Sequence, residues 1–167
     1  MLALTAAGRH EEAIREFENT VRVDPWHEGG CTALGLLLAE AGRLDEAAGC
    51  FSRILEMSPR GADPYKYLGM IDLRRGKVKQ AVSNLSKAGL LRPDDPEIHS
   101  ELGLAHLSQG EYQDAVASFS QALEQNPRDT DAHHNLAIAY KRLGNMEKAK
   151  EHFSASLPSD PKKQYSQ

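Results

Sequence analysis

Residues 108–127 read SQGEYQDAVASFSQALEQNP, and their spacing of small, large apolar and proline residues returns along the chain. Thirty-four residues earlier, residues 74–93 read RRGKVKQAVSNLSKAGLLRP, and residues 40–59 before them read EAGRLDEAAGCFSRILEMSP. Self-similarity at one fixed period indicates a repeat architecture, in which each repeat is one supersecondary unit.

Four series of residues keep this period of 34. They are Gly8, Gly42, Gly76, Gly110 and Gly144; Ala13, Ala47, Ala81, Ala115 and Ala149; Phe17, Phe51, Leu85, Phe119 and Phe153; and Pro25, Pro59, Pro93, Pro127 and Pro161. Four independent series at one spacing exclude coincidence, so the chain is expected to be an array of equivalent units.

Each unit carries the signals of two helices joined by a tight turn. In the third complete unit, Asp95 is suited to cap a helix whose first turn contains Pro96 and Glu97. Gly110 is suited to end that helix in a left-handed conformation. A second helix is expected to follow, with an apolar stripe at Ala115, Phe119 and Ala122, and to stop at Pro127.

This pattern resembles the tetratricopeptide repeat (TPR) family, whose 34-residue repeat is a helix–turn–helix. The resemblance implies an all-α, right-handed superhelical solenoid of antiparallel helix pairs. The expected units are a partial repeat at residues 1–27 with a truncated first helix, repeats at 28–61, 62–95, 96–129 and 130–157, and a flexible tail at 158–167. The aromatic or leucine of each unit is expected in the core.

Composition excludes several classes of function. The net charge is −4, and no Lys/Arg cluster of the kind that binds nucleic acid phosphates occurs. No apolar run approaches the length of a membrane span, and the N-terminal residues lack a signal-peptide pattern. The two cysteines, Cys31 and Cys50, suggest reduced thiols and a soluble, cytoplasmic protein.

The resemblance implies a partner-binding surface on the first helix of each repeat, which lines the concave wall of a TPR solenoid. Residues are counted here from Glu28, Ala62, Pro96 and Thr130 as position 1 of each repeat, and position 9 is aliphatic in all four. An exposed apolar stripe marks an interaction surface, and basic neighbours favour acidic residues in the partner. The expected peptide-binding residues are Leu36, Lys66, Met70, Leu73, Arg74, Leu104, Leu107, His134, Ile138 and Lys141. The alternative is that these aliphatic side chains fill gaps between neighbouring helices.

Catalysis, cofactors and metals are not expected. No phosphate-binding glycine loop, HExxH or GxSxG motif occurs. The seven histidines are interpreted as packing or solvated residues, and the carboxylates in helix caps and first turns as partners of the helix dipole. Aliphatic residues at position 9 also exclude the TPR subclass that clamps a C-terminal carboxylate with Lys and Asn.

Two hypotheses for function remain from the sequence. The first is a protein–protein interaction scaffold that binds a peptide or helical segment of a partner in the concave groove. The second follows from the ends, where the first repeat is partial, Pro158 interrupts the last helix and no polar capping helix follows. Uncapped ends suggest a self-associating homo-oligomer or a fragment of a longer TPR array.

Overall fold

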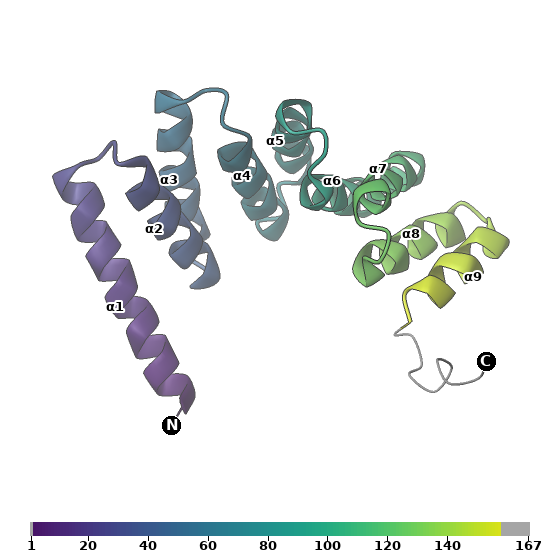
Figure 1. The fold of residues 1–167 in the computed structure, drawn as a ribbon, viewed down its shortest axis with the longest axis horizontal. Helices are drawn as coiled ribbons and strands as arrows, with labels where there is room; N and C mark the ends of the chain where they lie inside the picture. Colours follow the sequence, from purple (N-terminus) through teal and green to yellow (C-terminus); the bar gives the residue numbers. More distant parts are fainter. Residues whose placement is uncertain (1, 158–167) are drawn as a thin grey trace. The chain divides into compact units, whose positions relative to one another are not determined.

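The computed structural model describes residues 2–157, and side chains from residue 9 onward. The described residues are all-α, with nine helices and no strand (Figure 1). The helices are α1 (Leu2–Val23), α2 (Glu28–Glu40), α3 (Leu44–Met57), α4 (Ala62–Arg74), α5 (Val78–Leu91), α6 (Pro96–Gln109), α7 (Tyr112–Gln125), α8 (Thr130–Arg142) and α9 (Met146–Ala155). The tail expected to be flexible, residues 158–167, lies outside the described part of the chain.

The helices pair as α2 with α3, α4 with α5, α6 with α7, and α8 with α9. The first helix of each pair begins at Glu28, Ala62, Pro96 or Thr130, the residues from which the sequence repeats are counted. Turns of two or three residues join the paired helices, and such short turns make neighbouring helices antiparallel. The chain divides into two compact units, Met1–Leu91 with α1 to α5 and Arg92–Gln167 with α6 to α9.

The local signals around α6 have the predicted roles. The side chain of Asp95 accepts a hydrogen bond from the backbone N–H of Glu97, at 3.0 Å, and Pro96 is the first helical residue. Gly110 ends the helix in the left-handed region, with φ of 79°. The equivalent glycines of the other three pairs have φ between 71° and 80°, a conformation that costs residues with a Cβ more.

Gly8 behaves differently from those four glycines. α1 runs without interruption from Leu2 to Val23, so Gly8 lies inside a helix and not in a turn. The expectation of a short first helix before Gly8 therefore differs from the structure. Seven residues are too few to form a stable separate helix, and they extend the following helix instead.

Each unit has its own core, which includes periodic residues of the second helices of its pairs. In the first unit the cluster is centred on Ile14, Cys31, Leu34, Phe51 and Ile54, and in the second on Ala115, Phe119, Ala132, Leu136 and Ala139. The predicted stripe of Ala115, Phe119 and Ala122 is fully buried.

The aromatic side chains of the first and last described helices are less buried than predicted. Phe51, Leu85 and Phe119 are buried, whereas Phe17 and Phe153 are only half-buried. Phe17 belongs to α1 and Phe153 to α9, the first and last helices that the structure describes. Because a repeat is covered by its neighbours, a helix that packs against fewer neighbours leaves its side chains closer to solvent.

Candidate functional site

In the first unit, the predicted binding residues lie on α2 and α4. Leu36, Met70 and Leu73 are half-buried. Leu36 also packs against the hydrophobic core of its unit. These side chains therefore combine contact with the protein interior and a solvent-accessible face, a combination that both the groove interpretation and the gap-filling interpretation allow.

In the second unit, the equivalent residues lie on α6 and α8, two helices that contact each other. Leu104 and Leu107 are half-buried and pack against the core cluster that contains Phe119 and Leu136. Ile138 on α8 is half-buried as well. We define Leu104, Leu107 and Ile138 as the α6–α8 aliphatic face.

Three of the predicted basic and histidine residues are exposed, and they differ in whether the side chain is hydrogen-bonded to another helix. Lys141 and His134 are exposed on α8, and the His134 ring meets the edge of Phe153 with ring centroids 5.4 Å apart. Arg74 is exposed, and its Nη1 donates a hydrogen bond of 2.6 Å to the carbonyl of Ala39. This bond occupies the guanidinium at the last turn of α2, where a cation stabilises the helix dipole.

Lys66 differs from the prediction. Its side chain is 6 % exposed, and its ammonium lies 5.2 Å from the ring centroid of Tyr67. Lys66 therefore contributes to packing within the first unit and not to a solvent-facing basic rim. The long alkyl stem of lysine readily covers apolar surface. The residue type and its position in the repeat therefore could not distinguish a lysine that packs from one that faces solvent.

Two histidines at equivalent positions bond to the turns that precede their helices. The Nε2 of His99 lies 2.7 Å from the carbonyl oxygen of Pro93, and the Nε2 of His133 lies 3.2 Å from that of Pro127. A carbonyl accepts hydrogen bonds, so each Nε2 carries the proton. These contacts hold the start of a helix to the turn before it.

His133 also pairs with His152 of α9, a residue that the sequence did not single out. Their Nδ1 atoms are 3.0 Å apart. Because the Nε2 of His133 donates to Pro127, its Nδ1 accepts the bond from His152. Burial is the main cause that lowers the pKa of His152, and the nearby His133 lowers it further. The two histidines are 19 residues apart, so their contact is tertiary and leaves no local signal in the sequence.

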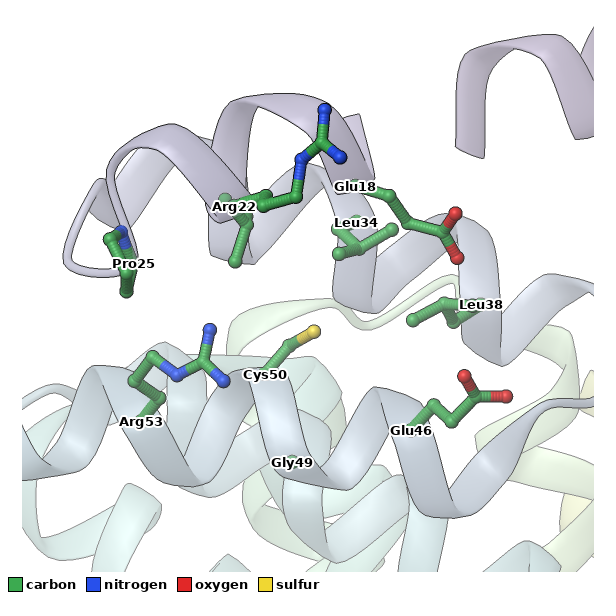
Figure 2. A pocket seen from close by; sticks show the side chains of 10 residues that line it. Glu18, Arg22, Pro25, Leu34, Leu38, Glu46, Gly49, Cys50 and Arg53 are labelled. Atoms are coloured by element: carbon green, nitrogen blue, oxygen red, sulfur yellow. The ribbon is translucent and has the colours of Figure 1, made fainter. Parts of the chain in front are cut away.

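A cavity of about 380 Å³ lies between α1, α2 and α3 in the first unit (Figure 2). Its walls combine the charged residues Glu18, Arg22, Glu46 and Arg53 with the apolar residues Leu34 and Leu38, and the Cys50 side chain points into it. Burial and the neighbouring Cys31 raise the pKa of the Cys50 thiol to about 11. A thiol is nucleophilic as the thiolate, so this cavity does not provide a reactive cysteine at neutral pH.

We expect Cys50 to react with a disulfide reagent at pH 7.5 roughly two orders of magnitude more slowly than an unperturbed cysteine, whose pKa is about 8.5. The rate is measured with Ellman's reagent on the folded protein, with the unfolded chain as reference. It should rise about tenfold per pH unit up to pH 10. A folded-state rate equal to the unfolded one would contradict this assignment.

No helix within residues 2–157 has the length and apolar character that crossing a lipid bilayer requires.

Comparison with known families and structures places the chain among repeat proteins. Residues 4–63 and 106–167 match the family model described as Tetratricopeptide repeat, and residues 69–110 match one described as TPR repeat. No curated protein gives a significant match over the sequence.

Solved structures with a similar fold include two of MamA. One MamA crystal structure has a TM-score of 0.86 at 22 % identity and covers 97 % of this chain and 95 % of that chain. MamA from Desulfovibrio magneticus RS-1 has a TM-score of 0.83 at 22 % identity, covering 93 % and 88 %. YrrB, described as a TPR protein with an unusual peptide-binding site, has a TM-score of 0.75 at 23 % identity, covering 92 % and 79 %.

At these identities the solved structures establish the fold, while the family models cover most of the sequence. The observed fold agrees with the family models and with the solved structures. It has helix pairs with a 34-residue period, glycines with left-handed φ in the turns and a buried apolar stripe. The chain is therefore a member of the tetratricopeptide repeat family, an all-α solenoid of helix pairs.

Proposed function

We propose that this chain binds a peptide or helical segment of a partner protein through the first helices of its repeats, which are α2 and α4 in the first unit and α6 and α8 in the second. The TPR fold is a protein–protein interaction module, and the aliphatic residues of these four helices supply its apolar contacts. The single observation that carries the proposal is that four consecutive repeats place an aliphatic side chain at position 9 and that all four, Leu36, Met70, Leu104 and Ile138, keep solvent-accessible surface.

The second unit supports the proposal most directly. The core cluster against which Leu104 and Leu107 pack already contains Phe119 and Leu136, both buried. The backbone of Gly103 contacts the Phe119 ring closely, which holds α6 against α7. A rigid scaffold therefore presents Leu104, Leu107 and Ile138, and a rigid surface loses less conformational entropy when a partner binds.

The chemistry of the surface indicates the class of segment. Aliphatic side chains can pack against the apolar face of an amphipathic segment. Such a segment binds a groove through apolar side chains spaced along one side of its helix. Lys141 is exposed on α8, near the predicted contact residues in sequence, and favours acidic residues beside the apolar anchors. A peptide-binding site is described for YrrB, which shares the fold.

The experiment starts from a random peptide library displayed on phage and selected against the intact chain. The affinity of an enriched peptide is then measured for the wild type and for the double variant Leu104→Ser/Ile138→Ser. We expect the affinity to fall at least about tenfold, because each aliphatic contact buries surface worth roughly 1–3 kcal/mol.

The matched control is Val116→Ser/Leu123→Ser on α7. Val116 and Leu123 are half-buried and pack against the same core cluster as Leu104, but they belong to the second helix of the pair. This control should lose stability to a similar extent and keep its affinity for the peptide. The proposed surface is contradicted if both double variants lose affinity equally. It is also contradicted if neither double variant loses affinity.

Self-association is a second candidate, favoured by exposed apolar side chains around α9. Leu143, Met146 and Leu157 are 37 %, 50 % and 67 % exposed, respectively. Exposed apolar surface on a soluble protein marks contacts with other chains. Light scattering over a hundredfold range of concentration separates the candidates, since a constant molar mass excludes assembly over that range and a rising mass supports it.

A further inference from the structure

The turn between α6 and α7 brings three possible metal ligands together. His106 lies in the last turn of α6, Glu111 immediately precedes α7 and Asp114 lies in its first turn. One ligand atom of each residue lies within 4.8 Å of the other two. The Nδ1 of His106 is 2.7 Å from Oε2 of Glu111.

In two other repeats, two of the three equivalent positions also contact each other, with different residues. In the first complete repeat, Nε of Arg43 donates to Oε1 of Glu46 at 2.6 Å. In the fourth, the ammonium of Lys148 lies 5.1 Å from the ring centroid of Tyr140. The helix–turn–helix therefore brings side chains at these positions close together, and the residue types at these positions differ between repeats.

The third repeat alone places three metal-ligand types at these positions. The equivalent sets are Leu38, Arg43 and Glu46; Asp72, Lys77 and Gln80; His106, Glu111 and Asp114; and Tyr140, Asn145 and Lys148. Each of the other three sets includes a basic residue, whereas the set at the α6–α7 turn has two carboxylates and an imidazole.

The charge of the cluster is a second, independent observation. Glu46 is paired with Arg43 at 2.6 Å, and this pair lowers the pKa of Glu46. Within the described residues, Glu111 pairs with His106, and neither Glu111 nor Asp114 has an ion pair with a lysine or arginine. Two carboxylates held this close without a lysine or arginine partner favour a bound cation.

We propose that His106, Glu111 and Asp114 bind one divalent transition-metal cation, with Zn²⁺ as the representative ion. Imidazole and carboxylate together are ligands of Zn²⁺, at bond lengths of about 2.0–2.2 Å. Tetrahedral ligands at that radius are about 3.4 Å apart. The His106–Glu111 contact therefore opens slightly on binding and the Asp114 carboxylate adjusts, which is possible because both carboxylates are exposed.

This site departs from the sequence-based expectation that the histidines are packing or solvated residues and that acidic residues at helix starts stabilise the helix dipole. Three protein ligands leave a coordination position for water or for a ligand atom of a partner. Bound metal links the end of α6 to the start of α7. The inference is separate from the proposed peptide surface, and either can fail without the other.

The test is a calorimetric titration of the intact, reduced chain with zinc chloride, comparing the wild type with His106→Gln and Asp114→Asn. We expect one site in the wild type and an affinity at least about tenfold weaker in each variant, as loss of a ligand or its support produces. A second measurement locates the ion: Mn²⁺ should broaden the amide NMR signals of residues 106–114 before all others.

Two controls exclude other binding groups. Asp131→Asn removes an exposed acid from the first turn of α8, and His133→Gln removes the His133–His152 pair. Both should bind zinc as the wild type does. Absence of binding at millimolar zinc, equal loss in either control, or broadening centred outside residues 106–114 would each overturn the proposal.

Discussion

Replacing Phe119 by alanine is expected to lower the free energy of unfolding by about 3–5 kcal/mol, the usual cost of truncating a buried aromatic side chain. Phe119 is fully buried in the core of the second unit. Its ring also contacts the backbone at Gly103, so alanine would leave a cavity that α6 and α7 cannot close without moving. Urea denaturation followed by circular dichroism measures the loss.

Phe153 provides the matched control, because it is the same residue at the equivalent position of the next repeat. It is half-buried, and alanine there removes fewer contacts. We expect Phe153→Ala to cost clearly less than Phe119→Ala. Equal losses, or a loss for Phe119→Ala under about 1 kcal/mol, would contradict the assignment of Phe119 to a closely packed core.

The second large effect concerns a glycine inside a helix. A Cβ added at Gly103 would lie 2.7 Å from Cε1 of Phe119 and 2.8 Å from its Cδ1. Overpacking of this kind costs about 1–3 kcal/mol, whereas alanine gains about 0.5–1 kcal/mol over glycine within a helix. We therefore expect Gly103→Ala to destabilise the protein despite the higher helix propensity of alanine.

Gly49 is the control for propensity alone. It lies within α3, and an added Cβ would meet no atom within 4 Å. Gly49→Ala should stabilise the protein by about 0.5–1 kcal/mol, a change of sign relative to Gly103→Ala. The opposite signs are read from the same urea titrations. Stabilisation by both substitutions would show that α6 and α7 are not in close contact at Gly103.

The architecture was predictable from the sequence because its determinants are local and recur. Asp95 and Pro96 specify the start of α6, and Gly110 permits the left-handed φ that ends it. The apolar stripe that contains Phe119 specifies which face of α7 is buried. None of these inferences needs knowledge of distant contacts, and repetition at a period of 34 reinforces each of them.

The features that were missed depend on tertiary context. The continuous α1 through Gly8 and the partial burial of Phe153 depend on which neighbours are present. The burial of Lys66 depends on how its stem packs. The convergence of His106 with Asp114 follows from the turn geometry, yet in the sequence each residue has a common local explanation.

We propose that the fixed residues build the scaffold, while the variable faces of the first helices of the repeats, α2, α4, α6 and α8, bind a partner segment. Hydrogen–deuterium exchange on the complex with a selected peptide tests this most directly, because amides beneath a bound segment are protected. We expect slower exchange in one or more of these four helices, above all in α6 and α8, with α7 and α9 unchanged. Protection confined to α7 and α9 would contradict it.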